Sequence, residues 1–238
     1  MNRVKNITMI LFLIAALAGV AANQQAVNQN REGLQALTGH VEYLELRDTL
    51  QKEQLCRLEW TLDLSVLDSC GIITNGYGHG SCVAIGPDLV LTAGHCIGYK
   101  GGWIEIGGIK YDILDEWKSE QYDVGFVRID GTLPYLQLGE MPQLLDTVYF
   151  VGAPIDVELV NMITKGIVSK LDINGLGDWA GVMIVDAFGN SGSSGCALLN
   201  QQGQIIGIAV GGYGNTTPEL CEPISHIREA LEEYNAAH

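Results

Sequence analysis

Three short segments of the chain combine residue types that could together break an acyl bond. His95 lies in Thr-Ala-Gly-His-Cys after an apolar run, Asp123 opens the run Asp-Val-Gly-Phe-Val, and a Gly/Ser cluster occupies positions 189–195. Singly, such patterns are more typical of a structural histidine, a turn residue and a loop. Together they supply a base, an acid to orient it, a serine hydroxyl and a glycine-rich turn whose N–H groups could bind an oxyanion. We therefore expect nucleophilic catalysis by serine.

The order and surroundings of these segments indicate a family. Asp123 follows His95 by 28 residues and Ser194 follows Asp123 by 71 residues, an order found in one of three unrelated triad folds. TAGHC and DVGFVRI resemble the chymotrypsin-like, trypsin-fold serine proteases. The segments LPYLQLGE, VYFVGAP, TKGIVS and VDAFGNSGSSG are more similar to the bacterial HtrA/Deg group of that superfamily. The resemblance covers the chain from about Gly71 onward and implies a serine endopeptidase acting on proteins or peptides.

Two serines compete for the role of nucleophile. The motif around Ser191 superficially resembles the family's GNSG, but the family's serine stands at a set distance before a hairpin of two apolar strands. Counting back from that hairpin leads to Ser194. The resemblance then implies His95 as general base, Asp123 as its orienting acid, and an oxyanion hole formed by the N–H groups of Gly192 and Ser194. Ser191 is expected to be dispensable.

The resemblance also locates the pocket for P1, the substrate residue before the scissile bond. Trypsin-like members carry an Asp six residues before the nucleophile, which selects Lys or Arg; this chain has Phe188 there. The opposite wall is expected from Val210, Gly211 and Gly212, whose backbone would also pair with substrate. We expect cleavage after Val, Ala or Leu, unless Asp186 enters the pocket.

Several features depart from the family pattern. Ser193 stands where trypsin-type zymogens have an Asp, and no IVGG-like segment lies at a suitable distance, so activation by N-terminal insertion is not expected. No PDZ-sized segment follows the catalytic region. The alternative function is an inactive protease-fold binding module on a membrane-tethered stalk, but a binding role would need none of the three triad residues. We expect His79 to be a loop residue and His226 a surface residue.

The elements that position these groups are short apolar runs bounded by Gly, Pro and Asp. Two successive sets of such runs are separated by the segment 133–143, which contains two prolines. With the resemblance, they predict an all-β fold of two six-stranded antiparallel Greek-key barrels, at about 71–133 and 144–224. A C-terminal helix is expected at 225–235, with Ser225 as its N-cap.

The N-terminal region has a different pattern. Two basic residues precede an apolar run over 7–22 that ends in small residues, which indicates a signal peptide at 1–22 or an uncleaved membrane anchor. Apolar residues at alternating steps of three and four predict a helix within 23–69. It is either a coiled-coil stalk, which would join copies into a homo-oligomer, or a single helix packed on the catalytic domain at 70–238. We expect an exported protein, periplasmic or extracellular, held at a membrane if the apolar run is retained.

Composition narrows the function classes further. With 13 basic and 28 acidic residues, the net charge of −15 disfavours nucleic-acid binding. No metal or cofactor is expected, since the six cysteines include no Cys-x-x-Cys pair and favour disulfides of an oxidising compartment. Cys82–Cys96 resembles the bridge that flanks the family's catalytic histidine. Elimination and order pair Cys196 with Cys221 and Cys56 with Cys70.

Overall fold

The chain divides into two compact units, Met1–Trp60 and Thr61–His238. The computed structural model describes residues 62–74, 78–98, 101–173, 181–212 and 218–238, with nine residues between Arg31 and Arg47. Those nine residues are helical, as the apolar periodicity predicts. The expected signal or anchor at 1–22 lies outside the described residues. In the described part of the chain, no helix is long and apolar enough to span a membrane.

The first half of the second unit is an antiparallel sheet with the strand order β5-β4-β1-β2-β3-β7-β6. Its edge strands β5 and β6 are separated only by Asp112, yet β5 pairs with β4 and β6 pairs with β7. Because β5 and β6 do not pair with each other, the sheet is a half-barrel and not a closed barrel. The sequence predicted a closed barrel of six strands for this half. The seven described strands are β1 (Cys70–Thr74), β2 (His79–Ala84), β3 (Leu89–Ala93), β4 (Trp103–Ile106), β5 (Ile109–Tyr111), β6 (Ile113–Lys118) and β7 (Val124–Ile129).

The second half is a closed six-stranded barrel with the order β10-β13-β12-β11-β8-β9, which confirms the prediction for this half. Because β11 and β12 are buried along nearly all their residues, this barrel offers a rigid support for the loops between its strands. Its strands are β8 (Thr147–Gly152), β9 (Met162–Lys170), β10 (Met183–Asp186), β11 (Ala197–Leu199), β12 (Ile205–Gly212) and β13 (Glu219–Pro223).

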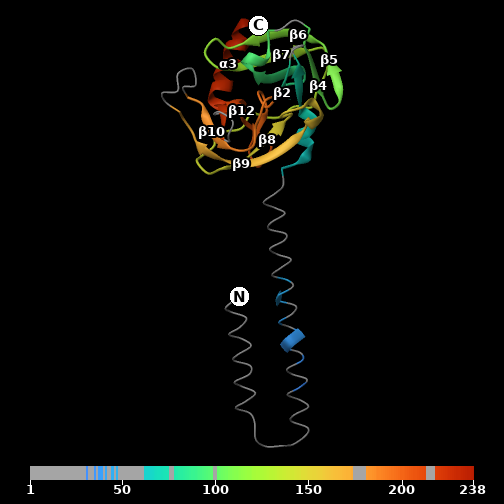
Figure 1. Ribbon diagram of the computed structural model, residues 1–238, viewed down its shortest axis with the longest axis vertical. Helices are drawn as coiled ribbons and strands as arrows, with labels where there is room; N and C mark the ends of the chain where they lie inside the picture. The colour runs from blue at the N-terminus through green and yellow to red at the C-terminus, as the bar shows by residue number, and fades with distance from the viewer. Residues whose placement is uncertain are drawn as a thin grey trace, which may run out of the picture. The chain divides into compact units, whose positions relative to one another are not determined.

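The C-terminal helix α3 (Ile224–Ala237) packs against β7, β12 and β13 and so ties the two halves together (Figure 1). The ring centroids of Tyr234 on this helix and Phe126 on β7 are 5.4 Å apart. The prediction that Ser225 caps this helix is wrong: the cap is Pro223, with no side-chain cap hydrogen bond. Pro223 ends β13 in an extended conformation, and the helix begins directly after it, so Ser225 already lies in the first turn.

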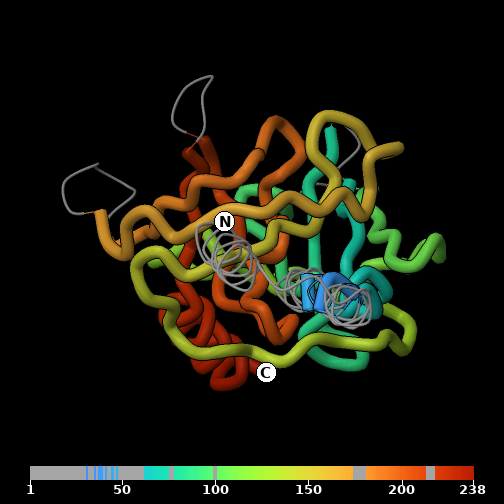
Figure 2. Tube along the Cα trace, turned by 90° about the horizontal axis from the view of Figure 1, so that it is seen from below, coloured from blue at the N-terminus to red at the C-terminus, as the bar shows by residue number. Residues whose placement is uncertain are grey.

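Two connecting segments complete the unit. The 3-10 helix η1 (Leu64–Ser69) precedes β1, and Leu62 and Val66 are buried in the core. Packing of this unit thus begins before residue 70, the boundary that we expected from the sequence. The segment 133–143 between the halves runs along one side of the unit (Figure 2) and forms an isolated bridge from Leu138 to Ile205. It is also held to the first half by the N–H groups of Leu133 and Leu136, which donate to backbone carbonyls before β3.

Candidate active site

The pairing of β3 with β7 brings His95 to Asp123. Ala93 is the register partner of Val124, so the short 3-10 turn η2 (Gly94–Cys96) starts beside the residue that precedes β7. The His95 ring donates from Nδ1 to Asp123 Oδ2 at 2.6 Å, and the His95 backbone N–H donates to Oδ1 at 2.9 Å. A Cβ at Gly94 would lie 3.1 Å from Oδ1. Glycine at this position therefore leaves room for the carboxylate.

The electrostatics of this pair favour a protonated imidazole. The pKa of His95 is raised from 6.5 to about 10, first by the hydrogen bond to Asp123 and then by the neighbouring Cys96 side chain, while burial opposes the rise. A carboxylate so placed stabilises the cation that a histidine becomes after it takes a proton. When the imidazole is neutral, the same carboxylate holds the hydrogen on Nδ1 and leaves Nε2 free to accept.

The turn that contains Ser194 is hydrogen-bonded to both halves of the unit. The Ser194 carbonyl accepts from the Ser81 N–H of β2 at 2.7 Å, and the Gly195 N–H donates to the Ala209 carbonyl of β12 at 2.7 Å. The Cys96 thiol, adjacent in sequence to His95, lies 3.7 Å from the Ser194 carbonyl oxygen. These contacts bring the partly exposed Ser194 next to the histidine turn. Within the described residues its hydroxyl makes no hydrogen bond, to His95 or to any other group.

The N–H groups along this turn fall into two sets. Those of Ser193, Gly195 and Cys196 donate to backbone carbonyls. The N–H groups of Gly192 and Ser194, by contrast, donate to no acceptor in the described part of the chain. Two unpaired donors that flank one residue are what a developing oxyanion would need.

Glycine at 192 is required by the shape of this turn. Gly192 has φ +92°, and a Cβ there would lie 2.4 Å from Nε2 of His79. The Ser81 hydroxyl donates to the Gly192 carbonyl at 2.9 Å, which holds that oxygen toward β2. His79 belongs to β2, not to a loop as expected, and its Nε2 lies 2.9 Å from the Ala153 carbonyl. Ser81 and His79 therefore shape the turn, a role that their sequence neighbours do not indicate.

The two neighbouring serines have different surroundings from Ser194. Ser193 is buried, and its Oγ accepts from the Asn190 N–H at 2.9 Å. Ser191 is exposed, and its N–H donates to Asn190 Oδ1 at 2.7 Å. Both residues thus shape the turn through Asn190, whereas the Ser194 carbonyl oxygen lies next to Cys96 of the histidine turn.

A second carboxylate and a second histidine lie behind Asp123. The Asp123 N–H donates to Glu222 Oε1 at 3.1 Å, and the His226 Nδ1 lies 2.6 Å from Glu222 Oε2. The His226 ring stacks on Tyr122 with the ring centroids 4.0 Å apart. His226 is therefore part of the support of Asp123, and with its side chain only 15% exposed it is not the surface residue that we expected. Its Glu222 contact comes from strand β13, which the sequence did not predict, and its ring contact comes from Tyr122, the residue before Asp123.

The residues expected to form the P1 pocket lie on two segments near Ser194. Val210 is buried, Gly211 is half-buried and Gly212 is exposed at the end of β12. Phe188 is 41% exposed as a residue, which does not fit a buried pocket floor. Asp186 is exposed at the end of β10.

The described cysteines are buried thiols. The five are Cys70, Cys82, Cys96, Cys196 and Cys221, so neither Cys82–Cys96 nor Cys196–Cys221 is bonded in the structure, and Cys56 lies outside the described residues. Burial is the largest cause of the raised pKa of Cys82, and the neighbouring thiols of Cys70, Cys96 and Cys196 raise it further. Since Cys82 has three thiol neighbours, its pairing on oxidation stays a prediction.

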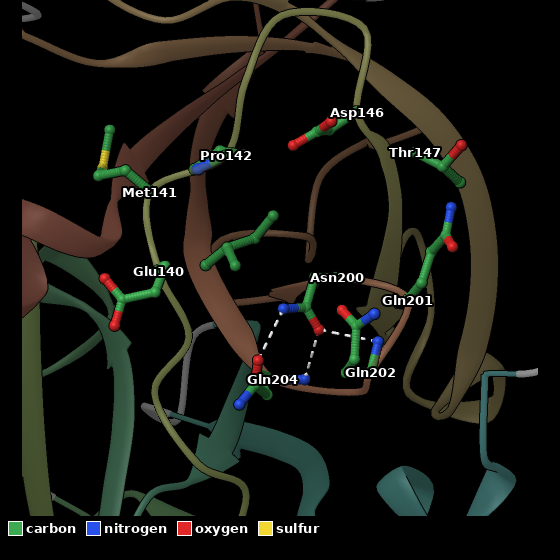
Figure 3. A pocket seen from close by; sticks show the side chains of 10 residues that line it. Glu140, Met141, Pro142, Asp146, Thr147, Asn200, Gln201, Gln202 and Gln204 are labelled. Carbon is green, nitrogen blue, oxygen red and sulfur yellow. Dashed lines mark hydrogen bonds between the residues drawn. The ribbon is translucent and has the colours of Figure 1, made fainter.

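Outside the His95 site, the described residues form a polar hollow but no metal site. There, no group of three or more His, Cys, Asp or Glu side chains is arranged to hold a metal ion. A hollow of about 340 Å³ lies between the linker near Pro142 and the β11–β12 hairpin (Figure 3). Asn200 and Gln204 are hydrogen-bonded to each other in its wall, and no residue of the His95 site lines it.

Comparisons with known proteins find peptidases among the proteins that this chain resembles. Residues 80–208 match the family model of the trypsin-like peptidase domain. The chain is 29% identical over 165 residues to protease Do-like 2 of Arabidopsis thaliana, which covers 59% of the chain and 25% of that protein. It is 34% identical over 83 residues to serine endoprotease DegS of Haemophilus influenzae, covering 34% of the chain and 24% of that protein. The chain thus spans about a quarter of the length of these relatives.

Solved structures show the same fold. A serine endoprotease from Yersinia pestis superposes with a TM-score of 0.62 at 23% identity, over 71% of this chain and 63% of that one. The active form of the Rv3671c protease from M. tuberculosis gives a TM-score of 0.62 at 19% identity, over 71% of this chain and 81% of that one.

Proposed function

The chain belongs to the trypsin-like peptidase family, since the match over residues 80–208 spans more than half of it, and we propose that it is a serine endopeptidase. The observation that carries the proposal is the His95–Asp123 pair, held next to the Ser194 turn by the β3–β7 ladder and by β2. The reaction is hydrolysis of peptide bonds through an acyl-enzyme intermediate.

In this mechanism Ser194 is the nucleophile. As its Oγ attacks the substrate carbonyl carbon, Nε2 of His95 takes the hydroxyl proton, and Asp123 stabilises the resulting imidazolium. The negative oxygen of the tetrahedral intermediate binds to the N–H groups of Gly192 and Ser194. His95 then protonates the leaving amine, and a water molecule, activated by the same histidine, hydrolyses the ester on Ser194.

The substrate is a protein or peptide bound in extended form. Strand β12 pairs with β13 as far as Gly212, but its pairing with β11 ends at Ile208. Beyond Ile208, the edge of β12 that faces away from β13 has no strand partner among the described residues. Val210, Gly211 and Gly212 thus offer an edge to which a substrate strand can add.

Export and assembly are part of the proposal. The segment 1–22 directs the protein out of the cytoplasm, to the periplasm or the extracellular space, and anchors it to the membrane if 7–22 is retained. The helical region within 23–69 would then act as a stalk and could join copies. N-terminal sequencing of the native protein tests this: a start near Asn23 shows cleavage, whereas an intact chain in the cytosol would contradict export.

A fluorophosphonate probe tests the catalytic proposal directly, because it reacts only with an activated serine. We expect the full chain to be labelled and to hydrolyse casein, the Ser194→Ala variant to do neither, and Ser191→Ala to do both. Absence of labelling and hydrolysis in the wild type would instead favour the inactive binding module.

A further inference from the structure

A buried carboxylate lies beside the Ser194 turn, and the mechanism above does not use it. Glu219 opens strand β13, where its register partner on β12 is Gly212. A Cβ at Gly189 would lie 2.3 Å from Glu219 Cδ, and a Cβ at Gly212 would lie 3.4 Å from Glu219 Oε1. The carboxyl group therefore occupies the space that side chains at these two glycines would fill.

These glycines belong to the two segments that flank the nucleophile. Gly189 lies on the segment that leads into the Ser194 turn, five residues before the serine. Gly212 lies on β12 three residues beyond Ala209, whose carbonyl accepts the Gly195 N–H. A P1 side chain next to Ser194 must enter between these segments, so the Glu219 carboxyl lies where that side chain would reach.

Glu219 has no counter-charge in the described part of the chain. It is only 5% exposed, and it makes no hydrogen bond or ion pair there. The titratable groups that interact with it electrostatically are the buried thiols of Cys196 and Cys221, which carry no positive charge. A buried ionised carboxylate without a partner is costly, and a cation supplied by a ligand would remove that cost.

We propose that Glu219 determines the specificity of the P1 pocket and selects substrates with lysine or arginine at P1. This inference rests on the proposed endopeptidase function. It replaces the preference for aliphatic residues expected from the sequence, which depended on Phe188 forming the pocket floor, whereas Phe188 is 41% exposed.

Two further observations agree with a cationic substrate. Burial raises the pKa of Glu219 from 4.5 to about 7, so the carboxyl is ready to ionise near neutral pH once a cation lies beside it. The net charge of −15 also attracts basic segments of a substrate from a distance.

The test compares fluorogenic peptides that differ only in P1, which is Lys, Arg, Val or Leu, at pH 8 with the full chain. We expect kcat/KM for Lys and Arg to exceed that for Val and Leu by at least about 10-fold. Glu219→Gln, which keeps the shape of the side chain, should lower kcat/KM for the basic peptides by roughly 10- to 100-fold. It should leave the aliphatic peptides within about 3-fold.

The matched control is Asp186→Asn, which removes an exposed carboxylate from the end of β10. It should leave the ratio of basic to aliphatic cleavage unchanged. A wild type that favours Val or Leu, or a Glu219→Gln variant that slows all four peptides equally, would overturn the inference. Fluorophosphonate labelling separates the two proposals: a labelled protein without basic preference refutes only the role of Glu219, and an unlabelled wild type refutes the peptidase function.

Discussion

Replacement of Asp123 by Asn tests whether the carboxylate both orients and charges His95. One carboxylate oxygen accepts from the His95 backbone N–H at 2.9 Å, and the other accepts from Nδ1 at 2.6 Å. An amide has only one oxygen. If that oxygen keeps the backbone N–H, the amide NH₂ faces Nδ1 and favours the tautomer with hydrogen on Nε2. That tautomer cannot accept the Ser194 proton.

The expected loss in kcat is about 10⁴-fold, which corresponds to about 5 kcal/mol of transition-state stabilisation. A shift in pH dependence should accompany it. His95 must be neutral to act as a base, so a raised pKa moves the rise of activity to higher pH. Asp123 is the largest cause of the raised pKa of His95. In Asp123→Asn the residual activity should therefore rise at lower pH than in the wild type.

Hydrolysis of a fluorogenic peptide, measured from pH 5 to 10 with about 1-unit steps, checks both expectations. The exposed Asp130, which follows β7, provides a matched control as Asp130→Asn, and thermal unfolding shows that both variants fold. A loss smaller than about 10-fold, or a midpoint that stays in place or moves to higher pH, would refute the reasoning about the pair.

Three other predictions follow from the same geometry. Ser194→Ala should lower kcat by roughly 10⁶-fold, whereas Ser191→Ala should keep most activity; the opposite result in peptide hydrolysis would show that Ser191 is the nucleophile. Because burial raises the pKa of Glu219 from 4.5 to about 7, the folded state holds this proton more tightly, and stability is lost as pH rises through that interval. Urea unfolding at pH 5 and pH 8 should therefore show a smaller decrease for Glu219→Gln than for the wild type, and equal decreases would contradict the burial argument. In protein isolated from an oxidising compartment, non-reducing peptide mapping should find Cys82 linked to Cys96, and a link from Cys82 to another cysteine would exclude that pairing.

Local chemistry in the sequence was sufficient for much of the fold. The strands β4 (Trp103–Ile106), β7 (Val124–Ile129) and β11 (Ala197–Leu199) begin and end where their apolar runs do. These strands are short, apolar and bounded by turn residues, so the pattern along the chain already specifies them. The segments around His95 and Asp123 could be singled out for the same reason, because each motif is contiguous.

Strands whose burial depends on distant partners were not foreseen. Strand β13 (Glu219–Pro223) contains two glutamates and a proline, which disfavour a buried strand, yet all five of its residues are buried between β10 and β12. The short edge strand β5 (Ile109–Tyr111) is mostly exposed and has no apolar pattern to indicate it. In both strands, pairing with neighbouring strands outweighs local propensity.

The surroundings of Glu219 and Glu222 were decided only by tertiary structure. In the sequence both are ordinary acidic residues near the C-terminus. In the fold, the carboxyl of Glu219 lies against Gly189, 30 residues earlier, and Glu222 accepts the N–H of Asp123, 99 residues earlier. Motifs reveal residues whose function depends on chain neighbours. The role that we propose for Glu219 depends on the space left by Gly189 and Gly212, and only the tertiary structure brings these positions together.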